Sequence, residues 1–141
     1  MHFTRRQTLL TALGAAAASV LPLRAFALEA PLVGSVEEFT GGATPGAGDL
    51  TLTAPEIAEN GNTVPIEVNA PDAVEIRVYA LGNPTPGVAA FTFGPLAASH
   101  YASTRIRLAG TQEVLAVAKM ADGSFISATK EVKVTIGGCG G

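Results

Sequence analysis

The only cysteine in this chain is Cys139, which stands third from the C-terminus between two pairs of glycines. Glycine has no Cβ and adopts either sign of φ, so a terminus of this composition predicts a flexible, narrow arm. Fully extended, the three residues after Ile136 carry the thiol roughly 10 Å beyond the body of the protein. The flexibility of this arm, residues 137–141, is assigned to Gly137, Gly138, Gly140 and Gly141.

The thiol of Cys139 is predicted to be an attachment point for a covalent group. A single cysteine cannot form an internal disulfide, cysteine is usually buried, and an exposed thiol is a liability that needs a reason. A free cysteine has a pKa of about 8.5 and only its thiolate is nucleophilic, so the arm alone predicts slow chemistry. Activation is expected from the pocket that receives the arm. The alternative is an incidental cysteine at a frayed end.

No catalytic or metal site is predicted beside this thiol. A flexible tail cannot hold a cysteine at hydrogen-bond distance from a base, so His100 is interpreted as an exposed loop residue without a role. One cysteine and one histidine do not complete a zinc site, and no glycine-rich phosphate loop lies between a strand and a helix. Arg105 and Arg107 share one strand face, which is either solvated or a partner contact. The body of the protein is not predicted to be an enzyme or to hold a cofactor.

Residues 1–27 have the features of a secretory signal. Arg5 and Arg6 precede an apolar run over residues 9–21, and residues 25–27 have the small-x-small pattern of a cleavage site. The paired arginines favour the twin-arginine route and hence a periplasmic protein. The apolar run is too short for a membrane anchor.

Removal of this leader would make the chain more acidic. The full sequence has nine basic and twelve acidic residues, a formal charge of −3. Three arginines leave with residues 1–27, and 6 − 12 gives −6. An acidic chain argues against nucleic acid as a ligand. Export of a folded protein without a cofactor motif also predicts an escorting partner.

The remaining residues, 28–136, predict a single all-β domain. A short helix is expected over Val33–Phe39, where Ser35 and Glu38 are spaced as a capping box and glycines follow. About seven segments then have strand character: Leu50–Thr53, Val64–Asn69, Val74–Ala80, Val88–Phe93, Thr104–Ala109, Glu113–Met120 and Ser124–Ile136. Short strands at this spacing, without a long helix, indicate an immunoglobulin-like β-sandwich.

The connections between these strands carry local signals. Pro55–Ala58 is predicted to make a tight or 3₁₀ excursion, and Asn60-Gly61 suits a turn with positive φ. Two prolines exclude a strand within residues 82–87, and Asp122-Gly123 is a strong hairpin signal. In the last strand one face is expected to carry Val132, Val134 and Ile136, and the other Glu131, Lys133 and Thr135.

Several sequence blocks resemble the SoxY family, the sulfur carriers of the periplasmic thiosulfate-oxidising Sox system. The resemblance runs from about residue 42 to the last residue and includes the twin-arginine leader. The blocks are residues 132–141 with the glycine-flanked cysteine, Pro55–Pro65, Asn83-Pro84-x-Pro86, Thr104–Ala109, Thr111-Gln112 and Asp122-Gly123.

This resemblance implies an immunoglobulin-like sandwich that works in a complex with a second small β protein, SoxZ. Cys139 matches the carrier cysteine of the family, which a haem enzyme loads with thiosulfate as a cysteine S-thiosulfonate. A hydrolase then releases sulfate and leaves a persulfide on the cysteine. The resemblance leaves open whether a molybdenum-dependent sulfur dehydrogenase also visits the arm.

Two other classes of protein remain as alternatives at this point. In the first, Cys139 is the nucleophile of a redox enzyme that turns over without partners. In the second, the chain is a structural periplasmic β domain whose terminal cysteine forms an intermolecular disulfide.

Overall fold

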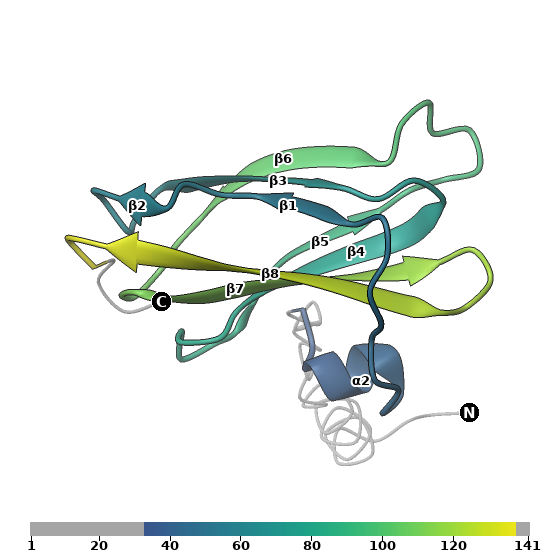
Figure 1. Ribbon diagram of the computed structural model, residues 1–141, viewed down its shortest axis with the longest axis horizontal. Helices are drawn as coiled ribbons and strands as arrows, with labels where there is room; N and C mark the ends of the chain where they lie inside the picture. Colours follow the sequence, from purple (N-terminus) through teal and green to yellow (C-terminus); the bar gives the residue numbers. More distant parts are fainter. Residues whose placement is uncertain (1–32, 138–141) are drawn as a thin grey trace, which may run out of the picture. The chain divides into compact units, whose positions relative to one another are not determined.

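The computed structural model of the chain describes residues 33–137 (Figure 1). Within that range the chain forms one short helix, α2 (Val36–Thr40), and eight strands. The strands are β1 (Thr51–Thr53), β2 (Ile57–Ala58), β3 (Val64–Asn69), β4 (Ala73–Ala80), β5 (Gly87–Thr92), β6 (Tyr101–Ile106), β7 (Gln112–Met120) and β8 (Phe125–Val134). They form a three-stranded sheet in the order β1-β3-β6 and a five-stranded sheet in the order β2-β8-β7-β4-β5.

The two sheets pack face to face as a sandwich. Along β3, Val64, Ile66 and Val68 are buried and the residues between them are exposed, as expected of a strand with one face on the core. The largest fully buried members of the cluster between the sheets are Ile66, Ile76 and Leu108. The predicted immunoglobulin-like sandwich is confirmed, with eight strands in the described range instead of about seven.

Helix α2 lies over the outer face of the five-stranded sheet. The predicted capping box is confirmed, since Ser35 Oγ accepts from the Glu38 N–H at 3.1 Å and Glu38 Oε2 accepts from the Ser35 N–H at 2.8 Å. This cap starts the helix three residues later than predicted. The Phe39 ring packs edge-on against Phe125 at 5.4 Å between centroids, and the Arg77 guanidinium lies 4.3 Å from its centre. These contacts hold the helix against the sheet.

The prediction of a tight or 3₁₀ excursion over Pro55–Ala58 is wrong. Ile57 and Ala58 form β2, which pairs in parallel with the end of β8. The Lys133 N–H donates to the Glu56 carbonyl at 2.9 Å, so β8 gains a neighbour on its outer side. Two residues are too few to show the alternating pattern of a strand, so the sequence does not predict β2. The segment becomes a strand because it pairs with the free edge of β8.

The position of β6 also differs from the prediction of Thr104–Ala109. Strand β6 begins three residues earlier, at Tyr101, and pairs along the whole of β3 from Asn69↔Tyr101 to Val64↔Ile106. Residues 107–109 leave the sheet, because their backbone groups bond to a side chain and to a loop at one end of the sandwich. The other strands beginning between residues 51 and 112 match their predicted ranges to within one residue at each end.

The predicted hairpin at Asp122-Gly123 is confirmed in position but has a three-residue loop. Gly123 has φ +85°, and its N–H donates to the Met120 carbonyl at 3.0 Å. The Met120 N–H donates to the Ser124 carbonyl at 2.8 Å. Asp122 does not have positive φ, so this is a type I turn followed by a left-handed glycine and not the two-residue type I′ turn.

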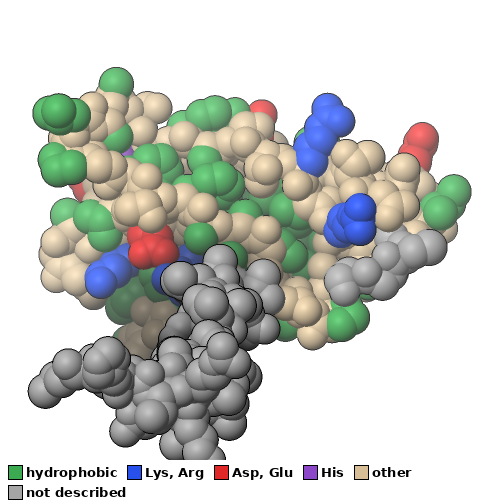
Figure 2. Space-filling model, turned by 180° about the vertical axis from the view of Figure 1, so that it is seen from behind, with side chains coloured by type: hydrophobic (Ala, Val, Ile, Leu, Met, Phe, Trp, Pro, Cys, Tyr) green, Lys and Arg blue, Asp and Glu red, His purple; other side chains and the backbone are tan. Residues whose placement is uncertain are grey.

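The β5 edge of the five-stranded sheet lies in a stretch without charge. Residues 78–104 contain no Asp, Glu, Lys or Arg. The face of the molecule in Figure 2 has few charged side chains among many hydrophobic ones. Leu96, in the loop after β5, is 98% exposed. The β2 edge differs, because Glu56 and Glu59 flank its two residues, and charge beside an edge discourages pairing with another chain.

Candidate functional site

The candidate site is the place where β8 ends and the C-terminal arm begins. Strand β8 ends at Val134, two residues earlier than predicted, and the chain continues to Gly137, the last described residue. Val132 is buried and Val134 partly buried, as predicted. Ile136 is 67% exposed, so the prediction that it shares a strand face with Val132 and Val134 is wrong. The strand has left the sandwich by that residue.

Residues 134–136 are nevertheless held on both sides. The Val134 N–H donates to Thr111 Oγ1 at 3.0 Å. Thr135 donates from its N–H to the Ala58 carbonyl at 3.1 Å and from Oγ1 to the Glu59 carbonyl at 3.0 Å. The backbone of the arm root therefore continues to make hydrogen bonds after the strand ends.

The turn at Asn60-Gly61 supplies a further contact to the root. The Gly61 N–H donates to the Ile136 carbonyl at 2.8 Å. The expected positive φ is absent at both Asn60 and Gly61. The turn is closed instead by the Asn60 side chain, whose Oδ1 accepts from the Asn62 N–H at 3.0 Å.

Gly137 lies tightly against the loop that joins β6 to β7. A Cβ built on Gly137 would overlap the carbonyl oxygen of Ala109. A carbonyl held in a loop cannot rotate away as a long side chain can. Glycine at this position is therefore required by close packing in addition to any flexibility of the arm.

Two buried amide side chains hold the loop that Gly137 touches. Asn83 donates from Nδ2 to the Arg107 carbonyl at 2.8 Å and accepts at Oδ1 from the Ala109 N–H at 2.9 Å. Gln112 donates from Nε2 to Asn83 Oδ1 at 2.9 Å and to the Gly110 carbonyl at 3.0 Å. Gln112 Oε1 accepts from the Gly82 N–H at 2.8 Å. Sequence reasoning noted both residues only within family blocks and assigned them no role, because their contacts are long-range.

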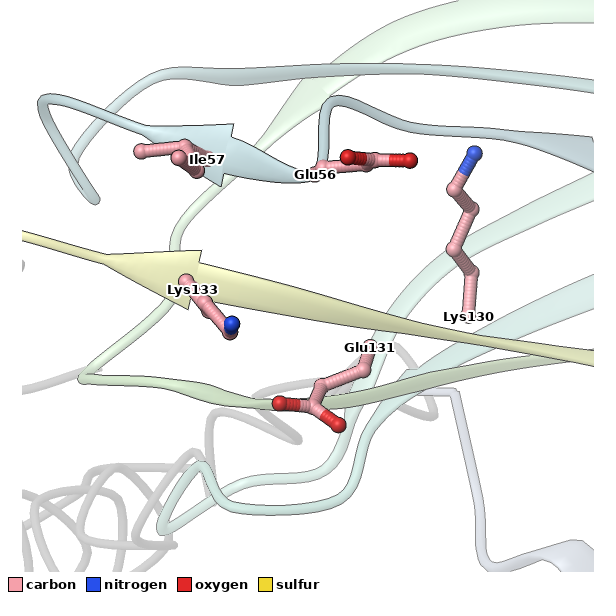
Figure 3. A pocket seen from close by; sticks show the side chains of 5 residues that line it. All are labelled: Glu56, Ile57, Lys130, Glu131 and Lys133. Carbon is pink, nitrogen blue, oxygen red and sulfur yellow. The ribbon is translucent and has the colours of Figure 1, made fainter.

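A shallow pocket of about 360 Å³ lies between β2 and the last part of β8 (Figure 3). Its lining residues are Glu56, Ile57, Lys130, Glu131 and Lys133. Ile57 is 60% exposed among these four charges, and the described residues form no ion pair here within 4 Å. Side chains of both signs beside a short edge strand are typical of an edge guarded against strand pairing. The pocket is a charged rim near the arm root and not an enclosed site.

His100 lies at the other end of the sandwich, where its interpretation as an exposed residue without a role is wrong. It is half-buried, its Nδ1 accepts from the Asp72 N–H at 3.2 Å, and its ring packs edge-on against Phe93 at 5.3 Å. It thereby holds Asp72, a non-glycine residue with φ +64°. His100 and Gly137 lie at opposite ends of β6, a strand of about 20 Å.

The remaining predicted features are placed as follows. Arg105 and Arg107 are exposed, which agrees with a solvated or partner-facing surface. Cys139, Gly138, Gly140 and Gly141 lie outside the described residues, as does the predicted leader 1–27. Among residues 33–137 no three His, Cys, Asp or Glu side chains are grouped as metal ligands. No helix in that range is long and apolar enough to cross a bilayer.

The fold and the site define the class of protein: an immunoglobulin-like sandwich whose last strand leads to a lone, glycine-flanked cysteine. The family model described as "Sulfur oxidation protein SoxY" matches residues 36–139, a range that ends on this cysteine. The chain belongs to the SoxY family. No curated protein sequence matches it.

Solved structures agree with this assignment. The sulfur carrier protein SoxY from Chlorobium limicola f thiosulfatophilum is 36% identical, with a TM-score of 0.57 over 67% of this chain and 88% of that one. A superoxide reductase (neelaredoxin) from Ignicoccus hospitalis is 17% identical, with a TM-score of 0.53 over 73% of this chain and 89% of that one. The second likeness shows the fold alone.

Proposed function

We propose that this protein is a sulfur carrier of thiosulfate oxidation, which holds pathway intermediates covalently on Cys139 and presents them to partner enzymes. Membership of the SoxY family carries the proposal, and the 36% identical sulfur carrier supports it. The position of the cysteine in the sequence agrees, because it comes three residues after a root, residues 134–136, that the sandwich holds by hydrogen bonds.

Loading the carrier is an oxidation. The Cys139 thiolate and thiosulfate join through a new S–S bond to give the S-thiosulfonate, and two electrons pass to the haem enzyme that catalyses the step. Hydrolysis of the S-thiosulfonate adds one water, breaks the bond from sulfur to the sulfonate group, and releases sulfate and two protons. A persulfide remains on Cys139. A sulfur dehydrogenase, where it operates, would oxidise that outer sulfur before a second hydrolysis.

The geometry of the body supports a carrier more than an enzyme. Two residues beyond Gly137 span about 7 Å, whereas His100 lies about 20 Å away along β6. A Cys139–His100 pair within one chain is therefore excluded by reach. We propose that the base that activates the thiol comes from the pocket of a partner.

The test is intact-mass spectrometry of the purified protein after incubation with thiosulfate and the loading haem enzyme. We expect a gain of one thiosulfate group, its conversion to a persulfide when the hydrolase is added, and neither product for Cys139→Ser. Turnover of thiosulfate by the protein alone would support the redox-enzyme alternative. A covalent dimer that Cys139→Ser abolishes, with sulfur oxidation intact, would support the structural alternative.

The glycines on either side of the cysteine are proposed to admit the arm to narrow pockets. Valine at Gly138 and Gly140 adds a branched Cβ and removes positive φ. We expect this double variant to slow every loading and release step while its thiol reacts with a small alkylating reagent at the parent rate. Undiminished sulfur transfer with all partners present would show that these two glycines are not needed to admit the arm.

We also propose that the working unit is a heterodimer with SoxZ. The uncharged β5 edge supports a protein contact on that side, since an unguarded edge strand readily accepts another chain. Ala90 is exposed on β5, and Ala90→Lys should reduce co-purification with SoxZ by at least tenfold. The matched control is Thr53→Lys on the exposed β1 edge. Equal recovery for both variants would remove β5 from the interface.

Export to the periplasm by the twin-arginine route completes the proposal. Without residues 1–27 the chain has six basic and twelve acidic residues. It would meet its partners in the periplasm. Replacing Arg5 and Arg6 together with lysine should leave the protein in the cytoplasm with its leader attached. Cell fractionation measures where the variant accumulates. Normal export of the variant would contradict this route.

A further inference from the structure

We propose that the sandwich builds a socket for the arm, which sets the point and direction in which Cys139 leaves the body. This arm socket consists of the turn 58–61 and the loop 107–111. Asn83 and Gln112 are its positioning residues. The inference rests on the proposed carrier function, since it concerns delivery of the same cysteine.

The motivating observation is that three segments far apart in the sequence meet at one place. Pro55–Pro65 contains the turn 58–61, and the Asn83 and Thr111-Gln112 blocks hold or form the loop 107–111. They are far apart in the sequence, and the chain brings them to the end of the sandwich where β8 stops (Figure 1). None of them contributes a group that could react with sulfur.

The two parts of the socket are joined to each other as well as to the arm root. The Leu108 N–H donates to the Gly61 carbonyl at 2.7 Å, and the Leu108 side chain is fully buried in the core. Gly61 thus bonds to the loop through its carbonyl and to Ile136 through its N–H. A displacement of the loop 107–111 would therefore move the turn 58–61 and the root together.

The side chains of Asn83 and Gln112 hold the loop 107–111 in place. Only 7% of Asn83 and 8% of Gln112 is exposed, and every polar atom of the two amides is hydrogen-bonded. A fully satisfied buried network is rigid and specifies one arrangement. The loop contacts the arm root at two places and so positions it. Thr111 Oγ1 accepts from the Val134 N–H, and the Ala109 carbonyl packs against Gly137.

The socket shortens the arm that can move. If motion begins after Gly137, the thiol is confined to a small volume within about 7 Å of that residue. A partner that docks beside the socket then meets the thiol in a defined place, and misplacement by about 1 Å can cost a hundredfold in rate. Gly137 and Gly138 consequently have different roles, packing for the first and freedom for the second.

The test uses a nitroxide attached to Cys139, the only cysteine, in the full chain. Paramagnetic broadening of backbone amide signals maps where the arm end spends its time and needs no sulfur chemistry. We expect broadening in the parent to concentrate on the socket. Gly137→Ala and Thr111→Val should spread it over a wider surface, whereas Gly138→Ala, the matched control, should not.

Gln112→Ala tests the positioning residues, with Gly123→Val as a control that destabilises the opposite end of the sandwich. We expect Gln112→Ala to spread the broadening and Gly123→Val to leave it on the socket. Where Gln112→Ala does not fold, Gln112→Glu replaces it, since that variant keeps the acceptor for Gly82 and loses both donors. If the folded Gln112 variant shows the same broadening as the parent, the Asn83–Gln112 network does not position the arm, and its proposed role is overturned.

A kinetic measurement completes the test. Gly137→Ala should lower the rate of thiosulfate loading by about tenfold or more, with alkylation of the thiol unchanged. Loading at the parent rate by Gly137→Ala, together with broadening equal to that of the parent, would overturn the socket. Absence of loading in the parent would instead refute the carrier function and leave the broadening result to decide the socket alone.

Discussion

The two ends of the sandwich are held together by different kinds of interaction. At the arm end the loops around 82 and 108 are joined through the buried amides of Asn83 and Gln112. At the far end, a backbone hydrogen bond from Ala121 to the Asp72 carbonyl joins the hairpin loop to the turn at Asp72, and the half-buried His100 adds a side-chain hydrogen bond to the same turn. Buried, fully paired side chains order the arm end more strongly than exposed turns order the far end.

This difference shows where a carrier needs rigidity. A mobile cysteine is useful only if it starts from a defined point, and the far end has no such requirement in the proposed function. The comparison predicts large stability effects at the arm end, moderate effects at the far end and almost none in the arm itself.

The largest effect is expected for Asn83→Ala. Removal of this amide leaves three groups without this partner: the part-buried Arg107 carbonyl and Ala109 N–H, and the buried Gln112 Nε2. We expect a loss of roughly 3 kcal/mol in the free energy of unfolding, measured by urea denaturation. The exposed Asn62→Ala is the control, with a change below about 0.5 kcal/mol. A loss below about 1 kcal/mol for Asn83→Ala would break the contrast between the two ends.

Gly123→Val at the far end should cost roughly 1–3 kcal/mol. Gly123 has φ +85° and open space around a built Cβ, so the penalty is backbone strain and not a clash. Gly94→Val is the control, because that glycine also faces open space but without positive φ. Thermal unfolding of both variants measures the difference. Equal melting temperatures would mean that the turn relaxes at no cost.

His100→Ala should lower stability by about 1 kcal/mol. The change removes the acceptor of the Asp72 N–H and the edge contact with Phe93. His100→Gln offers a polar atom in place of Nδ1 and should recover part of the loss. Calorimetry of the three proteins at neutral pH tests this, and a parent-like His100→Ala would show that the loop holds itself.

The hairpin should show a small dependence on pH. Hydrogen bonds from the Ser124 side chain and backbone lower the pKa of Asp122 below its ordinary value of 3.8. Because the folded pKa is lowered, the stabilisation is present above pH 3.8 and is lost as the pH falls through the folded value. The difference in melting temperature between the parent and Ser124→Ala should shrink on acidification. A difference that grows with acid would contradict the sign.

The smallest effect is expected for Cys139→Ser. A surface substitution near a chain end typically changes stability by less than about 0.5 kcal/mol, and the contacts described for the socket involve residues up to Gly137. Urea denaturation should therefore give the parent value while carrier function is abolished. A large drop would place the cysteine in a packed site and make the arm part of the body.

Much of this protein follows from local sequence patterns. The period of two predicts most strands to within one residue, the Ser35–Glu38 pair predicts the cap of α2, and Asp122-Gly123 predicts the hairpin. These features depend on neighbours along the chain, which any reader of the sequence can see. The lone cysteine between glycines likewise predicts the reactive end from the sequence alone.

Tertiary contacts decide the rest. Strand β2 exists because β8 offers it an edge, β6 takes its limits from β3, and His100 gains a role from Asp72, which lies 28 residues away. The arm socket is the clearest case, since it holds Thr135 of the arm root through the Glu59 carbonyl, 76 positions away in the sequence. Gly137 and Gly138 are the same residue type, so the sequence does not distinguish them. Folding brings the Ala109 carbonyl against Gly137, and this contact makes Gly137 a packing residue.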